Sequence, residues 1–142
     1  MWAANQALSG IIGVGVPQDW ATHRIAVELT AIWGIDHGRT LSIIQPALLR
    51  ELIEYKRAKL EQLGREVFGL PNPSAEDTIA ALETFYRSLR MPIHLRDADI
   101  NEHDAAERVM AALSGHGKAA LGGHAEIDEE KTFRILKRAL NS

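Results

Sequence analysis

The chain has 142 residues, of which 46% are hydrophobic and 25% are charged, and its net charge is −3. This length is enough for one domain with a hydrophobic core, and the charge balance favours neither a nucleic acid nor an anionic membrane as a partner. The absence of cysteine excludes a disulfide framework, a thiolate zinc site and a cysteine nucleophile, and it fits a cytoplasmic protein.

The first 18 residues carry no charged side chain, and they superficially resemble a signal peptide or a membrane span. They lack the positive start of a signal peptide, and Asn5, Gln6 and Pro17 help to make them too polar and too broken to cross a bilayer. We therefore expect a short helix over residues 1–12 that is buried against other protein surface, followed by a turn over residues 13–19.

Two helices are predicted next, on either side of a glycine. Asp19 is placed to cap a helix over residues 20–32, and Gly34 is placed to end it, because glycine accepts the left-handed conformation common at helix C-termini. Asp36 is placed to cap the following helix, in which Pro46 should produce a kink.

The rest of the chain also has helical patterning, without sustained strand alternation or an internal repeat. Ser74 and Asp77 form a capping-box pattern, while Asn101 and Asp128 are placed to open later helices. The segments predicted are a charged amphipathic helix at 55–69, a helix at 78–89, a connector at 90–100, a helix at 101–113, a glycine-rich loop at 114–127 and a last helix at 128–140. The prediction is an all-α fold: one compact helical domain over residues 1–142 with about six or seven helices.

His23 and His37 are the candidate metal ligands. On one unbroken helix their 14-residue separation would place them about 21 Å apart, at about 1.5 Å per residue, and they could not share an ion. If Gly34 reverses the chain, however, a helix–turn–helix can bring the two imidazoles together. The alternative is that each is an unrelated, half-buried polar residue.

A resemblance bears on that choice. The stretch GVPQDWATHRIAVELTAIWGIDHGRTLSIIQPALL resembles the metal-binding segment of the iron-containing alcohol dehydrogenases, closest to their NADP-dependent aldehyde reductase and butanol dehydrogenase branch. The similarity extends from MWAANQAL through KRAKLEQLGREVFG and MPIHLRDADI to HGKAALGGHAEI. It implies the C-terminal helical domain of that family, with His23 and His37 as two ligands of a divalent metal, Fe²⁺ or Zn²⁺, and NAD(P) as the redox cofactor.

The chain also departs from the family pattern. The family's nucleotide-binding domain and the helix that carries the other two metal ligands, an Asp and a His, have no counterpart in these residues. Val27 stands where the family commonly has a further histidine, one helical turn after the position of His23. We therefore assign no catalytic or cofactor-binding residue, expect only weak binding of Zn²⁺, Ni²⁺ or Cu²⁺, with Fe²⁺ weaker still, and expect no dehydrogenase activity from the chain alone.

The remaining histidines are interpreted as structural or solvated. His94 and His116 are expected in loop packing or capping, and His103 and His124 are expected to be exposed. Three hypotheses about function stay open: part of an NAD(P)-dependent alcohol or aldehyde oxidoreductase, a repurposed binding module, or a remnant without function. The expected partners are further copies of the chain or a separate cofactor-binding domain, with no nucleic acid and no membrane.

Overall fold

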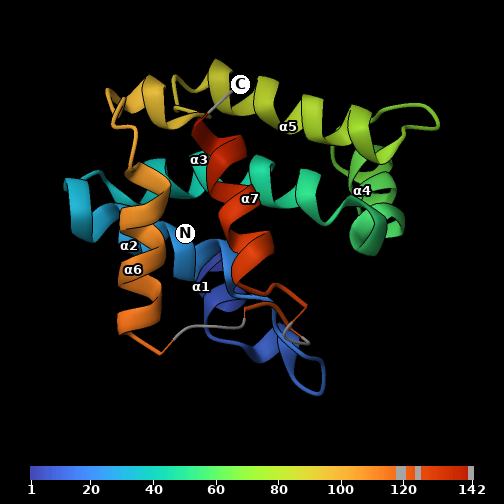
Figure 1. The fold of residues 1–142 in the computed structure, drawn as a ribbon. Coiled ribbons are helices and arrows are strands. Elements are labelled where there is room, and N and C mark those ends of the chain that lie inside the picture. Colours follow the sequence, from blue (N-terminus) through green and yellow to red (C-terminus); the bar gives the residue numbers. More distant parts are fainter. Residues whose placement is uncertain (118–120, 124–125, 141–142) are drawn as a thin grey trace.

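A computed structural model describes residues 1–117, 121–123 and 126–140. Within these residues the chain is all-helical, and its only other regular pairing is an isolated antiparallel bridge between Leu121 and Ile127 (Figure 1). The elements are α1 (Trp2–Leu8), the 3-10 helix η1 (Ile11–Gly13), α2 (Ala21–Trp33), α3 (His37–Glu51), α4 (Ile53–Glu66), α5 (Ala75–Ser88), the 3-10 helix η2 (Leu95–Ala98), α6 (Ala105–Gly115) and α7 (Glu129–Leu140). The predicted all-α class and number of helices are confirmed in the described residues.

Helix α3 lies at the centre of the fold. It packs against α2, α5 and α7, while α6 covers α2 and α7 on the outer side (Figure 1). Ile43, Ile44 and Leu48 of α3 are buried in the main hydrophobic core together with Ile25 and Leu29 of α2. Because these apolar residues recur at helical spacing, each helix presents one continuous stripe to the core. In the first turn of α3, His37 is half-buried and Thr40 is buried, whereas Gly38 and Arg39 are exposed.

Helices α4 and α5 pack against each other beside this core. A smaller cluster of Leu60, Ala75 and Ile79 is buried between them. At Gly64 the helices approach so closely that an added Cβ would lie 2.3 Å from the Thr78 hydroxyl and 2.7 Å from a ring carbon of Pro73. Helix α4 is separate from α3, because the chain leaves the helical conformation at Leu52.

Several predicted helix ends are confirmed. Ser74 and Asp77 form the reciprocal capping box that opens α5, and Asp128 accepts a hydrogen bond from the backbone N–H of Lys131 in the first turn of α7. Gly34 ends α2 in the left-handed conformation, with φ +69°. Asp19 accepts a hydrogen bond from the N–H of Ala21 at the start of α2.

Of the other predicted ends, the start of α3 directly after Asp36 is confirmed without the expected side-chain cap, and two are wrong. Asp36 precedes α3, but its side chain makes no capping hydrogen bond; its carbonyl oxygen accepts the N–H groups of Arg39 and Thr40 instead. Asn101 does not open a helix, because α6 begins at Ala105. The predicted first helix is also too long: it ends at Leu8, and Gly10 takes a left-handed conformation before η1.

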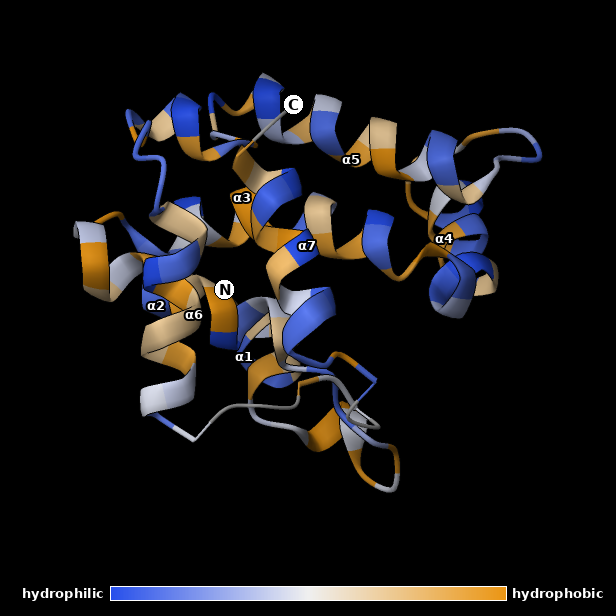
Figure 2. Ribbon diagram, viewed as in Figure 1, coloured by the Kyte–Doolittle hydropathy of each residue, from blue (hydrophilic) through white to orange (hydrophobic). Residues whose placement is uncertain are grey.

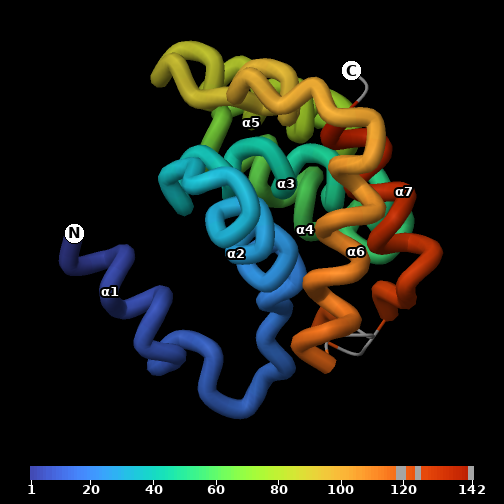
Figure 3. Tube along the Cα trace, turned by 60° about the vertical axis from the view of Figure 1, so that its left-hand side comes forward, coloured from blue at the N-terminus to red at the C-terminus, as the bar shows by residue number. Residues whose placement is uncertain are grey.

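The N-terminal segment, residues 1–16, lies apart from the helical core (Figure 3). None of the residues of α1 or η1 is buried, and Trp2 is 78% exposed. Figure 2 shows hydrophobic stretches along this segment, which the rest of the described chain does not cover. The expected burial of the segment is therefore not found among the described residues. No helix among the described residues is long and apolar enough to span a membrane.

Candidate metal centre

The structure brings His23 and His37 together. His23 lies in the first turn of α2, and His37 is the first residue of α3. Gly34 adopts a positive φ that lets the chain leave α2, and its N–H donates to the carbonyl oxygen of Thr30 to close the helix end. The two helices then pack side by side, so that the N-terminal turn of each carries one half-buried imidazole of the pair.

The pair has a geometry that suits two neighbouring ligands of one ion. Nε2 of His37 lies 3.1 Å from Nδ1 of His23, and the rings meet edge to face with centroids 4.5 Å apart and an interplanar angle of 85°. Two nitrogens bound to one ion at about 2.0–2.1 Å lie about 3.3 Å apart at a tetrahedral angle and about 2.9 Å apart at a right angle. The observed separation falls between these values, so the pair fits two adjacent coordination positions.

The described residues do not supply a third ligand. No group of three or more His, Cys, Asp or Glu side chains close enough to hold a metal ion occurs among them. The nearby carboxylate of Asp19 is held 2.7 Å from Nζ of Lys56, which directs it to α4. Among the described residues, His23 and His37 are thus two candidate ligands without a third beside them.

Two neighbouring side chains, Trp20 and Thr40, contact the pair, and sequence reasoning did not assign them a role at the site. The Trp20 ring meets the His23 ring edge to face, with centroids 5.6 Å apart. The Thr40 hydroxyl lies 3.4 Å from Nδ1 of His37 and 3.3 Å from the Thr30 hydroxyl. A threonine three residues after a helical histidine shares its face, and this i,i+3 spacing was the available signal.

Val27 lies one turn after His23 on α2 and is 37% exposed. Its side chain has neither a proton to donate nor a lone pair to accept one. The position is therefore open to solvent in this chain and contributes no acid–base chemistry.

The other histidines have separate surroundings. His94 is buried beside Asp97 at the start of η2, which agrees with its expected packing role. His116 follows the end of α6 with an exposed side chain, and its Nδ1 lies 3.1 Å from the buried carboxylate of Glu28 on α2. His103 is exposed, as expected. His124 lies outside the described residues.

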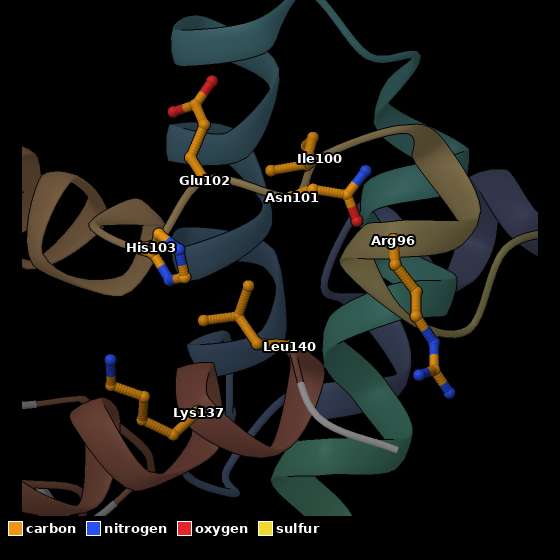
Figure 4. A pocket seen from close by; sticks show the side chains of 7 residues that line it. All are labelled: Arg96, Ile100, Asn101, Glu102, His103, Lys137 and Leu140. Carbon is orange, nitrogen blue, oxygen red and sulfur yellow. The ribbon is translucent and has the colours of Figure 1, made fainter.

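A surface pocket of about 370 Å³ lies elsewhere, between the loop before α6 and the last turn of α7 (Figure 4). It shares no residue with the histidine pair. Its charged groups are largely paired: Lys137 lies 3.1 Å from Glu107, and Glu102 contacts Arg108. The pocket therefore offers no concentrated charge of either sign. Its lining consists of Arg96, Ile100, Asn101, Glu102, His103, Lys137 and Leu140.

Comparison with known proteins gives a consistent assignment. Residues 2–140 match the family model described as "Fe-containing alcohol dehydrogenase family, C-terminal". The chain is 41% identical to the NADPH-dependent aldehyde reductase YqhD of Escherichia coli over 143 aligned residues, covering 98% of this chain and 37% of the relative. It is 30% identical to a probable NADH-dependent butanol dehydrogenase of Bacillus subtilis, covering 99% of this chain and 37% of that protein.

Solved structures agree with the sequence relatives. The crystal structure of Escherichia coli YqhD matches with a TM-score of 0.90 at 41% identity, covering 98% of this chain and 36% of that one. NADH-dependent butanol dehydrogenase A of Thermotoga maritima matches with a TM-score of 0.84 at 30% identity, covering 99% of this chain and 38% of that one. This chain thus spans little more than a third of the length of these relatives. It belongs to the iron-containing alcohol dehydrogenase family and corresponds to the C-terminal helical part of its members.

Proposed function

We propose that this chain is the metal-binding helical part of an NAD(P)-dependent oxidoreductase that acts on alcohols or aldehydes, and that residues 1–142 alone have no dehydrogenase activity. The observation that carries the proposal is the 3.1 Å approach of His23 and His37, on two helices, in a chain of this family. The names of the relatives, an NADPH-dependent aldehyde reductase and a butanol dehydrogenase, support the substrate class and the cofactor.

His23 and His37 would hold a divalent ion at two adjacent positions. When bound, such an ion supplies Lewis acidity to an alcohol or carbonyl oxygen. The chain's own contribution is to hold the two imidazoles at a fixed separation, because each lies in the first turn of a helix packed in the core. The exposed Val27 beside them carries no acid–base group, so proton transfer at that position would depend on water.

A metal titration tests the two proposed ligands. Zn²⁺, Ni²⁺ and Cu²⁺ should bind the purified chain weakly with one site per chain, and Fe²⁺ should bind more weakly still, following the usual order of affinity for nitrogen ligands. His23→Ala with His37→Ala should abolish this binding, measured by calorimetry. His103→Ala, which removes an exposed histidine, is the matched control and should bind as the unmodified chain does. Equal binding by the His23/His37 variant would exclude this pair as the site.

An activity assay tests the remainder of the proposal. The chain, supplied with Zn²⁺ or Fe²⁺, NADPH and butanal, should show no NADPH oxidation above the protein-free rate. Turnover by residues 1–142 alone would contradict the proposal. Turnover should appear only when a nucleotide-binding domain of this family is added to the same preparation.

A second candidate function, an oligomerising module, is favoured by the exposed apolar side chains of residues 1–16. Monomers rarely expose contiguous apolar patches beyond a few hundred Å², so a second copy or a cofactor-binding domain would cover this segment. Native mass spectrometry separates the candidates. A metal-free oligomer favours the module, whereas a bound metal or a co-purifying NADP-binding chain favours the oxidoreductase. The lack of cysteine supports the cytoplasm as the compartment for either.

A further inference from the structure

The Thr40 hydroxyl is buried next to the histidine pair. The Thr40 side chain is 0% exposed, and it lies in the first turn of α3, one turn after His37. Its oxygen is 2.8 Å from the backbone carbonyl oxygen of His37, 3.3 Å from the Thr30 hydroxyl and 3.4 Å from Nδ1 of His37. Three polar neighbours therefore compete for a group that has a single proton.

The distances decide where that proton lies. A hydroxyl has one proton to donate and two lone pairs that accept. The carbonyl oxygen of His37 can only accept, and it is the nearest of the three neighbours. If the proton pointed elsewhere, two oxygens would face each other at 2.8 Å with no hydrogen between them. The Thr40 hydroxyl therefore donates to this carbonyl and is left as an acceptor toward Nδ1 of His37.

The tautomers of both imidazoles follow from this assignment. Nδ1 of neutral His37 must carry its proton to donate to Thr40, so the lone pair of His37 lies on Nε2. That lone pair faces Nδ1 of His23 at 3.1 Å, which must then be the donor. The chain of hydrogen bonds thus runs in one direction, from His23 to His37 to Thr40 to the backbone.

We propose that Thr40 is a positioning residue that fixes His37 as its Nδ1–H tautomer and so turns the Nε2 lone pair toward the place of a shared ion. The hydrogen bond made by one ring nitrogen sets which nitrogen is available to a metal. The effect on metal affinity rests on the proposed metal site, whereas the tautomer itself does not. Thr40 acts through His37 and touches neither an ion nor a substrate.

The tautomer is measured on the metal-free protein by two-bond ¹H–¹⁵N correlation of the imidazoles, at a pH about two units above the ordinary histidine pKa of about 6.5. The unmodified chain should give the Nδ1–H pattern for His37. Thr40→Val, which keeps the shape and removes the hydroxyl, should shift His37 toward the Nε2–H form. Thr40→Ser should restore the Nδ1–H pattern. Thr132→Val on α7 removes another buried hydroxyl, one that donates to the carbonyl oxygen of Asp128, and should change nothing.

Zn²⁺ affinity gives the second measurement. Thr40→Val should weaken binding about 10- to 100-fold, the usual effect of removing a partner of a ligand histidine, while Thr40→Ser and Thr132→Val should bind as the unmodified chain does. An Nε2–H pattern for His37 in the unmodified chain would overturn the inference, and so would an unchanged tautomer in Thr40→Val. If the unmodified chain bound no Zn²⁺, the proposed metal function would fail and the tautomer spectra would still decide the role of Thr40. If Thr40→Val did not fold, the unmodified chain and Thr40→Ser would decide it.

Discussion

His94 shows how burial at one residue makes the whole fold sensitive to pH. Burial lowers the pKa of His94. The carboxylate of Asp97 lies 3.5 Å from Nδ1 of His94 and offsets only part of this effect. Burial alone would raise the pKa of Asp97, but hydrogen bonds from the backbone N–H groups of Ile93 and His94 outweigh it and lower the pKa. The folded state therefore holds a neutral imidazole beside a charged carboxylate.

This arrangement predicts a loss of stability in mild acid. Because the folded-state pKa of His94 lies below its unfolded value of about 6.5, the unfolded chain takes up the proton first as the pH falls. The free energy of unfolding should therefore decrease as the pH drops below about 6.5. His94→Gln removes this titration, so urea unfolding at about pH 7.5 and pH 5.5 should show a smaller pH-dependent loss than in the unmodified chain. His103→Gln, at an exposed histidine, is the control; equal losses in all three proteins would exclude burial of His94 as a cause.

The candidate site could be predicted only in part from its residues. The 14-residue spacing and the intervening Gly34 made the approach of His23 and His37 possible, and the family resemblance selected it over the alternative of two unrelated histidines. Thr40 was not predicted, because threonine occurs at many helical positions for reasons of packing. Its role depends on three oxygen–oxygen and oxygen–nitrogen distances, which only the folded chain defines.

At the scale of elements, the contact of α4 with α5 depends on the absence of a side chain at Gly64. A Cβ there would overlap the Thr78 hydroxyl at 2.3 Å and a Pro73 ring carbon at 2.7 Å, and both neighbours are buried. Neither can move without disturbing the start of α5. The close approach therefore makes this glycine a packing residue and not a helix breaker.

Two glycine-to-alanine substitutions should consequently have opposite effects. Gly64→Ala should lower the free energy of unfolding by about 1–3 kcal/mol, as overpacking in a core usually does. Gly115→Ala, at the last position of α6 with no atom within 4 Å of an added Cβ, should be neutral or stabilise the fold by up to about 1 kcal/mol. Urea unfolding of both variants measures the difference. A Gly64→Ala protein as stable as Gly115→Ala would mean that the helices can separate without cost.

Helix boundaries could be predicted where a side chain makes the cap or where a glycine ends the helix. The Ser74–Asp77 pair and Asp128 make their hydrogen bonds within three residues, so the sequence pattern was sufficient to predict the starts of α5 and α7. The start at Asn101 was wrong because residues 101–104 instead form a loop in which Glu102 contacts Arg108 and Trp33. The contact with Trp33 joins parts of the chain that are 69 residues apart, and helical spacing cannot predict it.

On the scale of the whole molecule, helices packed around α3 contrast with an uncovered N-terminal segment. The all-α class followed from helical periodicity along most of the chain, since core residues recur on one face of each long helix. The position of residues 1–16 did not follow, because an uncharged apolar sequence indicates burial without specifying what covers it. In this structure the rest of the described chain does not cover residues 1–16.

Self-association through this segment is a measurable expectation. The unmodified chain should form a dimer or larger oligomer as its concentration rises, because association removes apolar side chains from water. Leu8→Lys with Ile12→Lys should give a monomer in size-exclusion chromatography with light scattering. Val67→Lys alters a similarly exposed side chain (68%, compared with 66% for Leu8) outside the segment, directly after the last residue of α4, and it should leave the oligomer intact. A monomer at every concentration would exclude the oligomerising module.

The placement of His23 and His37 on separate helices has a consequence for the energetics of the fold. Because the pair exists only while α2 and α3 are packed, an ion held by both imidazoles binds the native state and not the unfolded chain. By mass action, such a ligand at 100 times its dissociation constant adds about 2.7 kcal/mol to the free energy of unfolding. Even a weakly bound ion, present in excess, would thus act as a reversible clamp between two core helices, and the melting temperature would rise with its concentration.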